Sequence, residues 1–116
     1  MITLKTFLSA DHVHPRNLYV KFKGFTDLYV RKGPYLIGTE NSREYKESIQ
    51  IANVTARKEG RGAFRGLIDF LEKNYPERVI VVECVQTERL EAICRHMGFE
   101  QINVGIGLHF AKGDFS

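Results

Sequence analysis

Long hydrophobic runs are absent from this chain, and so is any strong excess of one charge. No apolar stretch approaches the roughly 20 residues that a transmembrane helix needs, and the first residues lack the apolar region of a secretory signal peptide. The net charge is only +3 over 116 residues, which suits an anionic ligand but does not by itself indicate a nucleic-acid-binding protein. We therefore expect a cytoplasmic protein with no membrane partner.

Cysteine is scarce as well. The chain has two cysteines, Cys84 and Cys94, and their spacing is not that of a metal site, so we expect reduced thiols and no bound metal. The composition, 43% hydrophobic and 27% charged, is that of an ordinary globular protein rather than a disordered one. The length fits a single domain that spans residues 1–116.

The first half of the chain has the period of β-strands. Apolar and polar residues alternate over Leu18–Lys23, Leu28–Arg31 and Ser48–Val54, which predicts three strands. Gly33-Pro34 indicates a turn between the second and third of these strands. The polar segment Gly38–Lys46 is predicted to be a loop or a short helix.

From Gly62 onward the apolar period becomes that of a helix. Five residues lie on one face of a helix that ends before Pro76, namely Phe64, Leu67, Ile68, Leu71 and Tyr75. Val79–Val85 is a nearly continuous apolar run, which predicts a buried strand parallel to the one before the helix.

A second helix is predicted to begin after Thr87, a good N-cap residue. Its apolar face consists of Leu90, Ile93, Cys94 and Met97, and Gly98 closes it. The alternation from Ile102 to Phe110 then predicts one or two terminal strands. The order of elements is strands followed by β-loop-α-β-α-β, so the fold class is α+β or mixed α/β.

The loop before the first of these helices is rich in glycine and basic residues. Gly60, Arg61 and Gly62 expose backbone at a helix N-terminus, and Arg57, Lys58 and Arg65 surround them with positive charge. Unpaired N–H groups and the helix dipole make such a loop suitable for phosphates. The alternative is a tight turn with no ligand. The loop matches neither the Walker motif nor the dinucleotide fingerprint.

The segment from Ile51 to Phe99 resembles the GNAT superfamily of acyl-CoA N-acyltransferases. "VTARKEGRGAFRGLI" is similar to that family's strand, glycine loop and helix, in which Gly60 and Gly62 match two of the loop glycines. "TERLEAICRHMGFE" is similar to the family's second helix and its Gly-Phe exit. The resemblance implies a central mixed, mostly antiparallel sheet with a β-loop-α-β-α-β cofactor half.

The resemblance also implies acetyl-CoA as acyl donor, with no metal. The cofactor-binding residues that it implies are Val54, Thr55 and Ala56 at the end of the strand, Gly60, Arg61, Gly62, Ala63, Phe64 and Arg65 around the pyrophosphate, and Thr87 where the family usually has asparagine. Backbone N–H groups around Val54–Ala56 would polarise the thioester carbonyl.

Two residues are candidates for moving protons during acyl transfer. Cys94 stands where the family has a catalytic tyrosine, and the alternative is that it packs as a small hydrophobe in the helix face. Glu83 interrupts the apolar strand, and a carboxylate among valines is a candidate general base because desolvation disfavours its charged form. The alternative for Glu83 is an ion pair with an arginine or a polar lining role.

The resemblance leads to an acetyl-CoA-dependent N-acetyltransferase acting on a primary amine. The acceptor is a protein, a peptide or a small molecule. Its site would be open or covered by another subunit in a homodimer, because only about ten residues separate Leu8 from Leu18, enough for one short helix. The principal alternative is a catalytically inactive GNAT-fold binding protein. A third reading, a basic nucleic-acid-binding domain, is disfavoured because no aromatic-bearing motif accompanies Arg57–Arg65.

Overall fold

The structure is a computed structural model that describes residues 2–10, 17–39, 42–58, 61–83, 85–102 and 107–113. Its helices are α1 (Leu4–Ser9), α2 (Ala63–Asn74) and α3 (Glu88–His96). Its strands are β1 (Asn17–Tyr19), β2 (Phe25–Thr39), β3 (Ser42–Ala56), β4 (Val79–Val82), β5 (Glu100–Ile102) and β6 (His109–Lys112). Within these ranges, no helix is long and apolar enough to cross a membrane.

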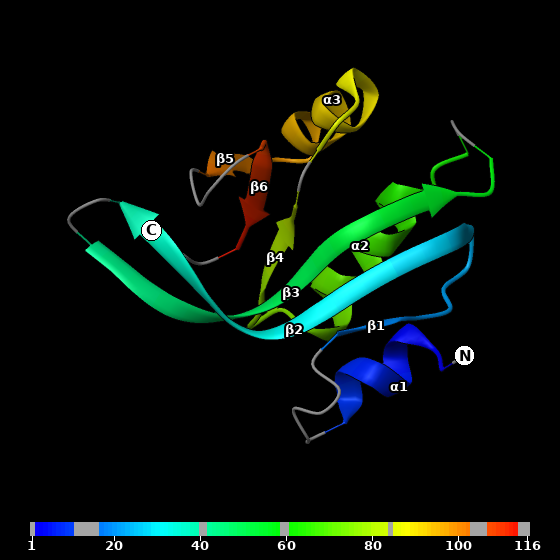
Figure 1. Cartoon of the computed structure of the whole chain (residues 1–116), viewed down its shortest axis with the longest axis horizontal. Helices are drawn as coiled ribbons and strands as arrows, with labels where there is room; N and C mark the ends of the chain where they lie inside the picture. The colour runs from blue at the N-terminus through cyan, green and yellow to red at the C-terminus, as the bar shows by residue number, and fades with distance from the viewer. Residues whose placement is uncertain are drawn as a thin grey trace.

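The strands form one open sheet in the order β1-β2-β3-β4-β6-β5. The β3–β4 pair is parallel and the other pairs are antiparallel. The α+β class, the mostly antiparallel sheet and the β-loop-α-β-α-β order are thus confirmed. In Figure 1 the long β2–β3 hairpin runs across the whole molecule, and α2 lies beside β3 and β4.

The predicted turn at Gly33-Pro34 is wrong, and so is the predicted loop or short helix over the described part of Gly38–Lys46; Glu40 and Asn41 lie outside the described residues. β2 continues through Gly33 and Pro34, and the pairing of β2 with β3 extends to Thr39 on β2 and Ser42 on β3. A proline is tolerated there because β1 pairs with β2 only as far as Arg31, so that no strand of the described residues pairs with β2 at Pro34 on this side. In the sequence alone, Gly33 and Pro34 indicate a turn because nothing local marks their pairing with β3, which keeps this segment extended.

The N-terminal region contains one short described helix, and residues 11–16 of the interval between Leu8 and Leu18 lie outside the described residues. The short helix α1 covers Leu4–Ser9 and so comes before most of the interval between Leu8 and Leu18. Thr3 caps it, since the Thr3 side chain accepts a hydrogen bond from Thr6 N. β1 is shorter than the predicted Leu18–Lys23, although Lys21 still forms a parallel bridge with Thr3.

The main core lies on one face of the sheet. Side chains from α1, α2 and α3 join the same cluster as alternate residues of the strands, with Leu28 and Val30 from β2, and Ile49 and Ile51 from β3. A smaller cluster of Ile37, Val79, Val81 and Ala111 buries the other face of β4 and β6. All four residues of β4 are therefore buried, as its apolar sequence predicts.

Candidate functional site

The parallel strands β3 and β4 separate half-way along β3. Ser48–Ile51 pair with Val79–Val82, and Glu83 N still donates a hydrogen bond of 2.9 Å to Ile51 O. At this point β3 has a bulge, because Tyr29 pairs with Asn53 while Val30 pairs with Ile51, which leaves Ala52 as the extra residue. A bulge bends its strand, and bulges are frequent next to functional sites. β3 then runs on to Ala56 beside β2 alone.

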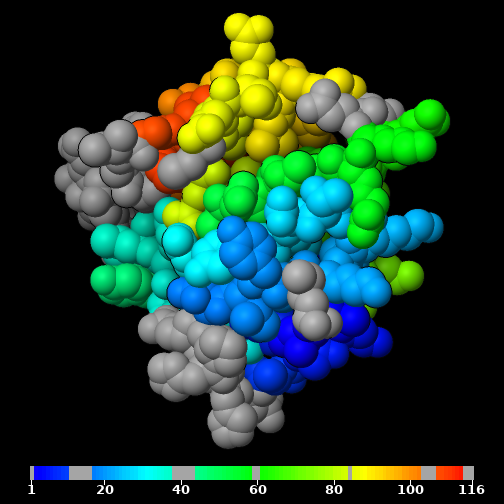
Figure 2. All heavy atoms as spheres, turned by 45° about the vertical axis from the view of Figure 1, so that its right-hand side comes forward, coloured from blue at the N-terminus to red at the C-terminus, as the bar shows by residue number. Residues whose placement is uncertain are grey.

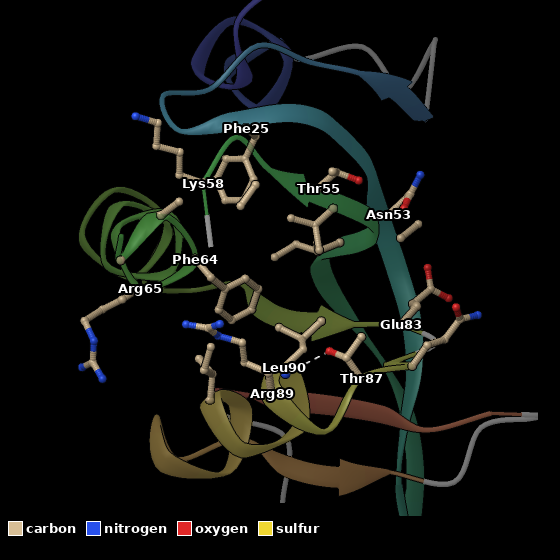
Figure 3. Close-up of a pocket in the computed structure, with 18 residues that line it drawn as sticks. Phe25, Asn53, Thr55, Lys58, Phe64, Arg65, Glu83, Thr87, Arg89 and Leu90 are labelled. Atoms are coloured by element: carbon tan, nitrogen blue, oxygen red, sulfur yellow. Dashed lines mark hydrogen bonds between the residues drawn. The ribbon is translucent and has the colours of Figure 1, made fainter. Parts of the chain in front are cut away.

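A cleft with a volume of about 710 Å³ opens where the two strands part. It is lined by the second half of β3, the start of α2, the segment after β4 and one side of α3. Figure 2 shows α3 (yellow) on one side of this region and the end of β3 (green) on the other. In Figure 3 the rings of Phe25 and Phe64 and the side chains of Asn53 and Thr55 surround the cleft.

The N-terminus of α2 forms one end of the cleft. Gly62 is its N-cap residue with φ +75° and, as a glycine, makes no side-chain hydrogen bond to the first turn. Gly66 N donates to Gly62 O at 2.9 Å as the first bond of the helix, so the amides of Ala63, Phe64 and Arg65 precede the helical ladder. A Cβ at Gly62 would meet no atom within 4 Å, so there is free space beside the N-cap residue. Such a helix start suits a phosphate group.

Positive charge surrounds this end of the cleft. Lys58, Arg65 and Arg89 line it. Figure 3 shows Lys58 and Arg65 extending outward beside the start of α2, while Arg89 reaches from α3 toward Phe64. On the other side of Gly62 and Ala63 lies a second hollow of about 530 Å³, which Lys23, Arg57 and Arg61 also line. Among the described residues that line the cleft, Glu83 is the only acidic one.

Glu83 lies at the opposite end of the cleft and is held by an arginine. Arg31 Nη1 donates to Glu83 Oε1 at 2.7 Å, and the Glu83 side chain is only 14% exposed. Arg31 itself lies over the Tyr29 ring, 5.8 Å from its centroid. The structure therefore places Glu83 at the cleft and forms the arginine ion pair that was one alternative to its role as a base.

Cys94 lies in the core rather than at the cleft. Its side chain is fully buried among the apolar residues that join α3 to the sheet. Burial raises the pKa of the Cys94 thiol to about 12, against a smaller opposite effect of Arg95. A thiol in this position neither touches the cleft nor gives up its proton readily, so the structure favours packing over the role of general acid.

Most of the cofactor residues implied by the sequence lie together in the cleft. These are Val54, Thr55, Ala56, Gly62, Ala63, Phe64, Arg65 and Thr87. Arg61 lies at the neighbouring hollow instead, and Gly60 is outside the described residues. Thr87 caps α3, since its hydroxyl accepts a hydrogen bond of 3.1 Å from Leu90 N, which confirms the predicted start of that helix.

Several cleft residues were missed by the sequence interpretation. Phe25 and Asn53 belong to the hairpin, whereas Gln86 and Arg89 flank the start of α3. No local pattern marks Phe25, because β2 only reaches the cleft through its pairing with β3. Arg89 could have been found from the helix start at Thr87, because it lies in the first turn of α3.

Comparison of the sequence with protein families and with curated proteins finds no match. Among solved structures, the chain is similar to a crystal structure of a tyrosine-to-phenylalanine mutant of KacT, with a TM-score of 0.54 and 14% sequence identity. The match covers 94% of this chain and 80% of that chain. At this level of identity the likeness concerns the fold alone, and it agrees with the α+β class.

Proposed function

We propose that the chain is a GNAT-type N-acetyltransferase that uses acetyl-CoA to acetylate a primary amine. The observation that carries this proposal is the coincidence of two features in one cleft. The strands β3 and β4 separate beyond Ile51, and the N-terminus of α2, with glycine as its N-cap residue, lies at the end of the resulting space. A long ligand with a phosphate end and a reactive end fits such a cleft better than a small anion does.

The phosphate end of the ligand would lie at α2. The amides of Ala63, Phe64 and Arg65 are positioned to donate to the pyrophosphate, with Lys58 and Arg89 nearby. CoA carries a third phosphate on its ribose, and the hollow lined by Lys23, Arg57 and Arg61 offers positive charge for it. This arrangement assigns the basic residues around the loop to two phosphate positions.

The reactive end would lie between β3 and Glu83. The main chain of Val54–Ala56 runs along the cleft where β4 no longer pairs with it, which suits it to bind the pantetheine arm and the thioester carbonyl. In the reaction, the amine nitrogen bonds to the acyl carbon and loses a proton, the C–S bond breaks and the leaving thiolate takes a proton from solvent. Glu83 is the described acidic residue that could accept the proton of the amine.

The alternative is a GNAT-fold protein that binds CoA or a partner without catalysis. Two observations favour it. Cys94 is buried away from the cleft, so the residue in place of the family's tyrosine cannot serve as the acid. Glu83 is engaged with Arg31 at 2.7 Å, so it must release this partner or share its carboxylate to act as a base.

Calorimetric titration with acetyl-CoA and with 3′-dephospho-CoA tests the binding part of the proposal. We expect acetyl-CoA to bind and Arg65→Glu to weaken it by about tenfold, because the substitution replaces attraction by repulsion next to the pyrophosphate. Lys73→Glu is the matched control, since it makes the same charge change at the other end of α2. Weaker binding of the dephospho compound would support the second hollow as the site of the third phosphate.

Thiol release in the presence of amines tests the catalytic part. Turnover with any amine of a broad panel, reduced in Glu83→Gln at unchanged affinity for acetyl-CoA, would support the transferase. Binding without turnover across the panel would favour the non-catalytic alternative. Absence of binding to any CoA species would contradict both.

A further inference from the structure

The far part of β3 has an edge that no described strand covers. β3 begins at Ser42, but β4 starts opposite Ser48, so residues 42–47 pair only with β2. Among the described residues no other strand is hydrogen-bonded to this stretch. Figure 1 shows this end of the hairpin extending away from the helices. An open strand edge offers a row of N–H and C=O groups to another chain.

This edge has no glycine or proline to interrupt pairing, and its charged side chains oppose pairing with any strand whose charges do not complement them. By contrast, β2 contains Gly33 and Pro34, and a proline removes a ladder donor. The stretch Ser42–Glu47 contains neither glycine nor proline. It also bears the most exposed large apolar side chain of the described residues, since Tyr45 is 70% exposed. Leu36, directly opposite Tyr45 on β2, is 36% exposed and extends the apolar surface.

The charges on this edge suit a second copy of the same strand. In an antiparallel pair related by a two-fold axis normal to the sheet, opposed residues point to the same face, so the axis must pass through a residue that meets its own copy. An axis through Glu44, Lys46 or Glu47 places like charges directly opposite each other, which is destabilising. An axis through Tyr45 places Glu44 opposite Lys46 on both sides and packs Tyr45 against its copy.

We propose that this edge of β3 pairs with the same edge of a second chain, with the two-fold axis at Tyr45. The two sheets then join into one continuous sheet across the dimer. Glu44 and Lys46 already approach within 2.7 Å in one chain, and in the dimer each acquires an opposite charge from the other copy. The short stretch buries less surface than a standard interface, so the dimer is reversible and depends on protein concentration.

Charge exchange on one strand tests this arrangement. In sedimentation velocity and native mass spectrometry, we expect the unmodified chain to dimerise with increasing concentration. Glu44→Lys and Lys46→Glu should each weaken self-association by about tenfold or more, because each turns two cross-strand attractions into repulsions. Equimolar mixing of the two variants should give a heterodimer, and the double variant should dimerise as the unmodified chain does.

The mixing experiment distinguishes lost pairing from damage to the fold. Two misfolded variants would not form a heterodimer, whereas two folded variants with complementary charges would. Lys73→Glu, on α2, changes the charge equally and should leave dimerisation unchanged. A monomeric unmodified chain at all concentrations would overturn the proposal. So would single variants that dimerise at full strength, or a mixture that forms no heterodimer. The acetyl-transfer proposal is unaffected by these outcomes, because the cleft lies at the other end of β3.

Discussion

The positive φ angle of Gly62 gives the sharpest test of how the helix start is built. At φ +75° an L-residue is strained, and the left-handed conformation costs a non-glycine residue about 1–2 kcal/mol. A Cβ at this position would meet no atom within 4 Å, so steric clash adds nothing to this cost. Gly62→Ala should therefore lower the free energy of unfolding by about 1–2 kcal/mol, which corresponds to roughly 4–8 °C in Tm.

Gly66 is the matched control on the same helix. Its Cβ would also meet no atom within 4 Å, and its φ is not positive. Since alanine is favoured over glycine in a helix interior by about 0.8–1 kcal/mol, Gly66→Ala should raise the free energy of unfolding by about that amount. The same substitution is thus expected to have opposite signs four residues apart.

Urea denaturation followed by circular dichroism measures both variants against the unmodified chain. If the slope of the unfolding free energy against urea concentration is the same for all three proteins, their free energies can be compared directly. If Gly62→Ala were as stable as the unmodified chain, or if it gained stability as Gly66→Ala does, the left-handed N-cap and the phosphate site built on it would be refuted.

Three further predictions concern the core and the cleft. Ile68→Ala removes a fully buried side chain between α2 and the sheet and should cost about 2–5 kcal/mol in urea denaturation; a loss under 1 kcal/mol would contradict the packing. Burial raises the pKa of Cys94 to about 12 from 9.0, so its stabilising effect is complete below pH 9 and lost as the pH rises toward 12; a pH titration of stability should show this decline, and Cys94→Ala should lack it. Arg31→Gln removes the partner of Glu83 and should change kcat while acetyl-CoA affinity stays constant; an unchanged kcat would exclude Glu83 as the base.

The second half of the fold, from Gly62 onward, could be predicted from the sequence because its signals are local. The five apolar residues from Phe64 to Tyr75 repeat with the helical period, and four of them lie in the core face of α2. The valine-rich run after them is too apolar for anything but a strand covered on both faces. Thr87 and Gly98 mark the two ends of α3, and Gly98 has the expected positive φ of +88°.

The first half was harder to predict because pairing overrides its local signals. In isolation, Gly33 and Pro34 indicate a turn. Their pairing with Ser48 and Glu47 of β3 nevertheless holds them in an extended strand. The bulge at Ala52 has no mark in the sequence, although it lies where the cleft opens. Such features depend on contacts between segments that are distant along the chain.

The candidate site shows the same division. The residues of the glycine loop and of the β3 end were predicted as a group, and those described lie together, Arg61 excepted. The Arg31–Glu83 ion pair joins residues from β2 and the end of β4, and no spacing in the sequence could name the partner. For Cys94 the sequence left two readings open, since the same apolar stripe fits both a buried thiol and an inward-facing acid.

Amide NMR of the isotope-labelled chain during titration with acetyl-CoA tests the central claim most directly. The amides of Ala63, Phe64 and Arg65 would bind the pyrophosphate, and those of Val54–Ala56 would lie along the pantetheine arm. We expect these signals to shift together and to saturate with one ligand per chain, while the amides of Tyr45 and Lys73 stay unchanged. Saturable binding that leaves both groups of amides unmoved, or no binding at all, would contradict the account.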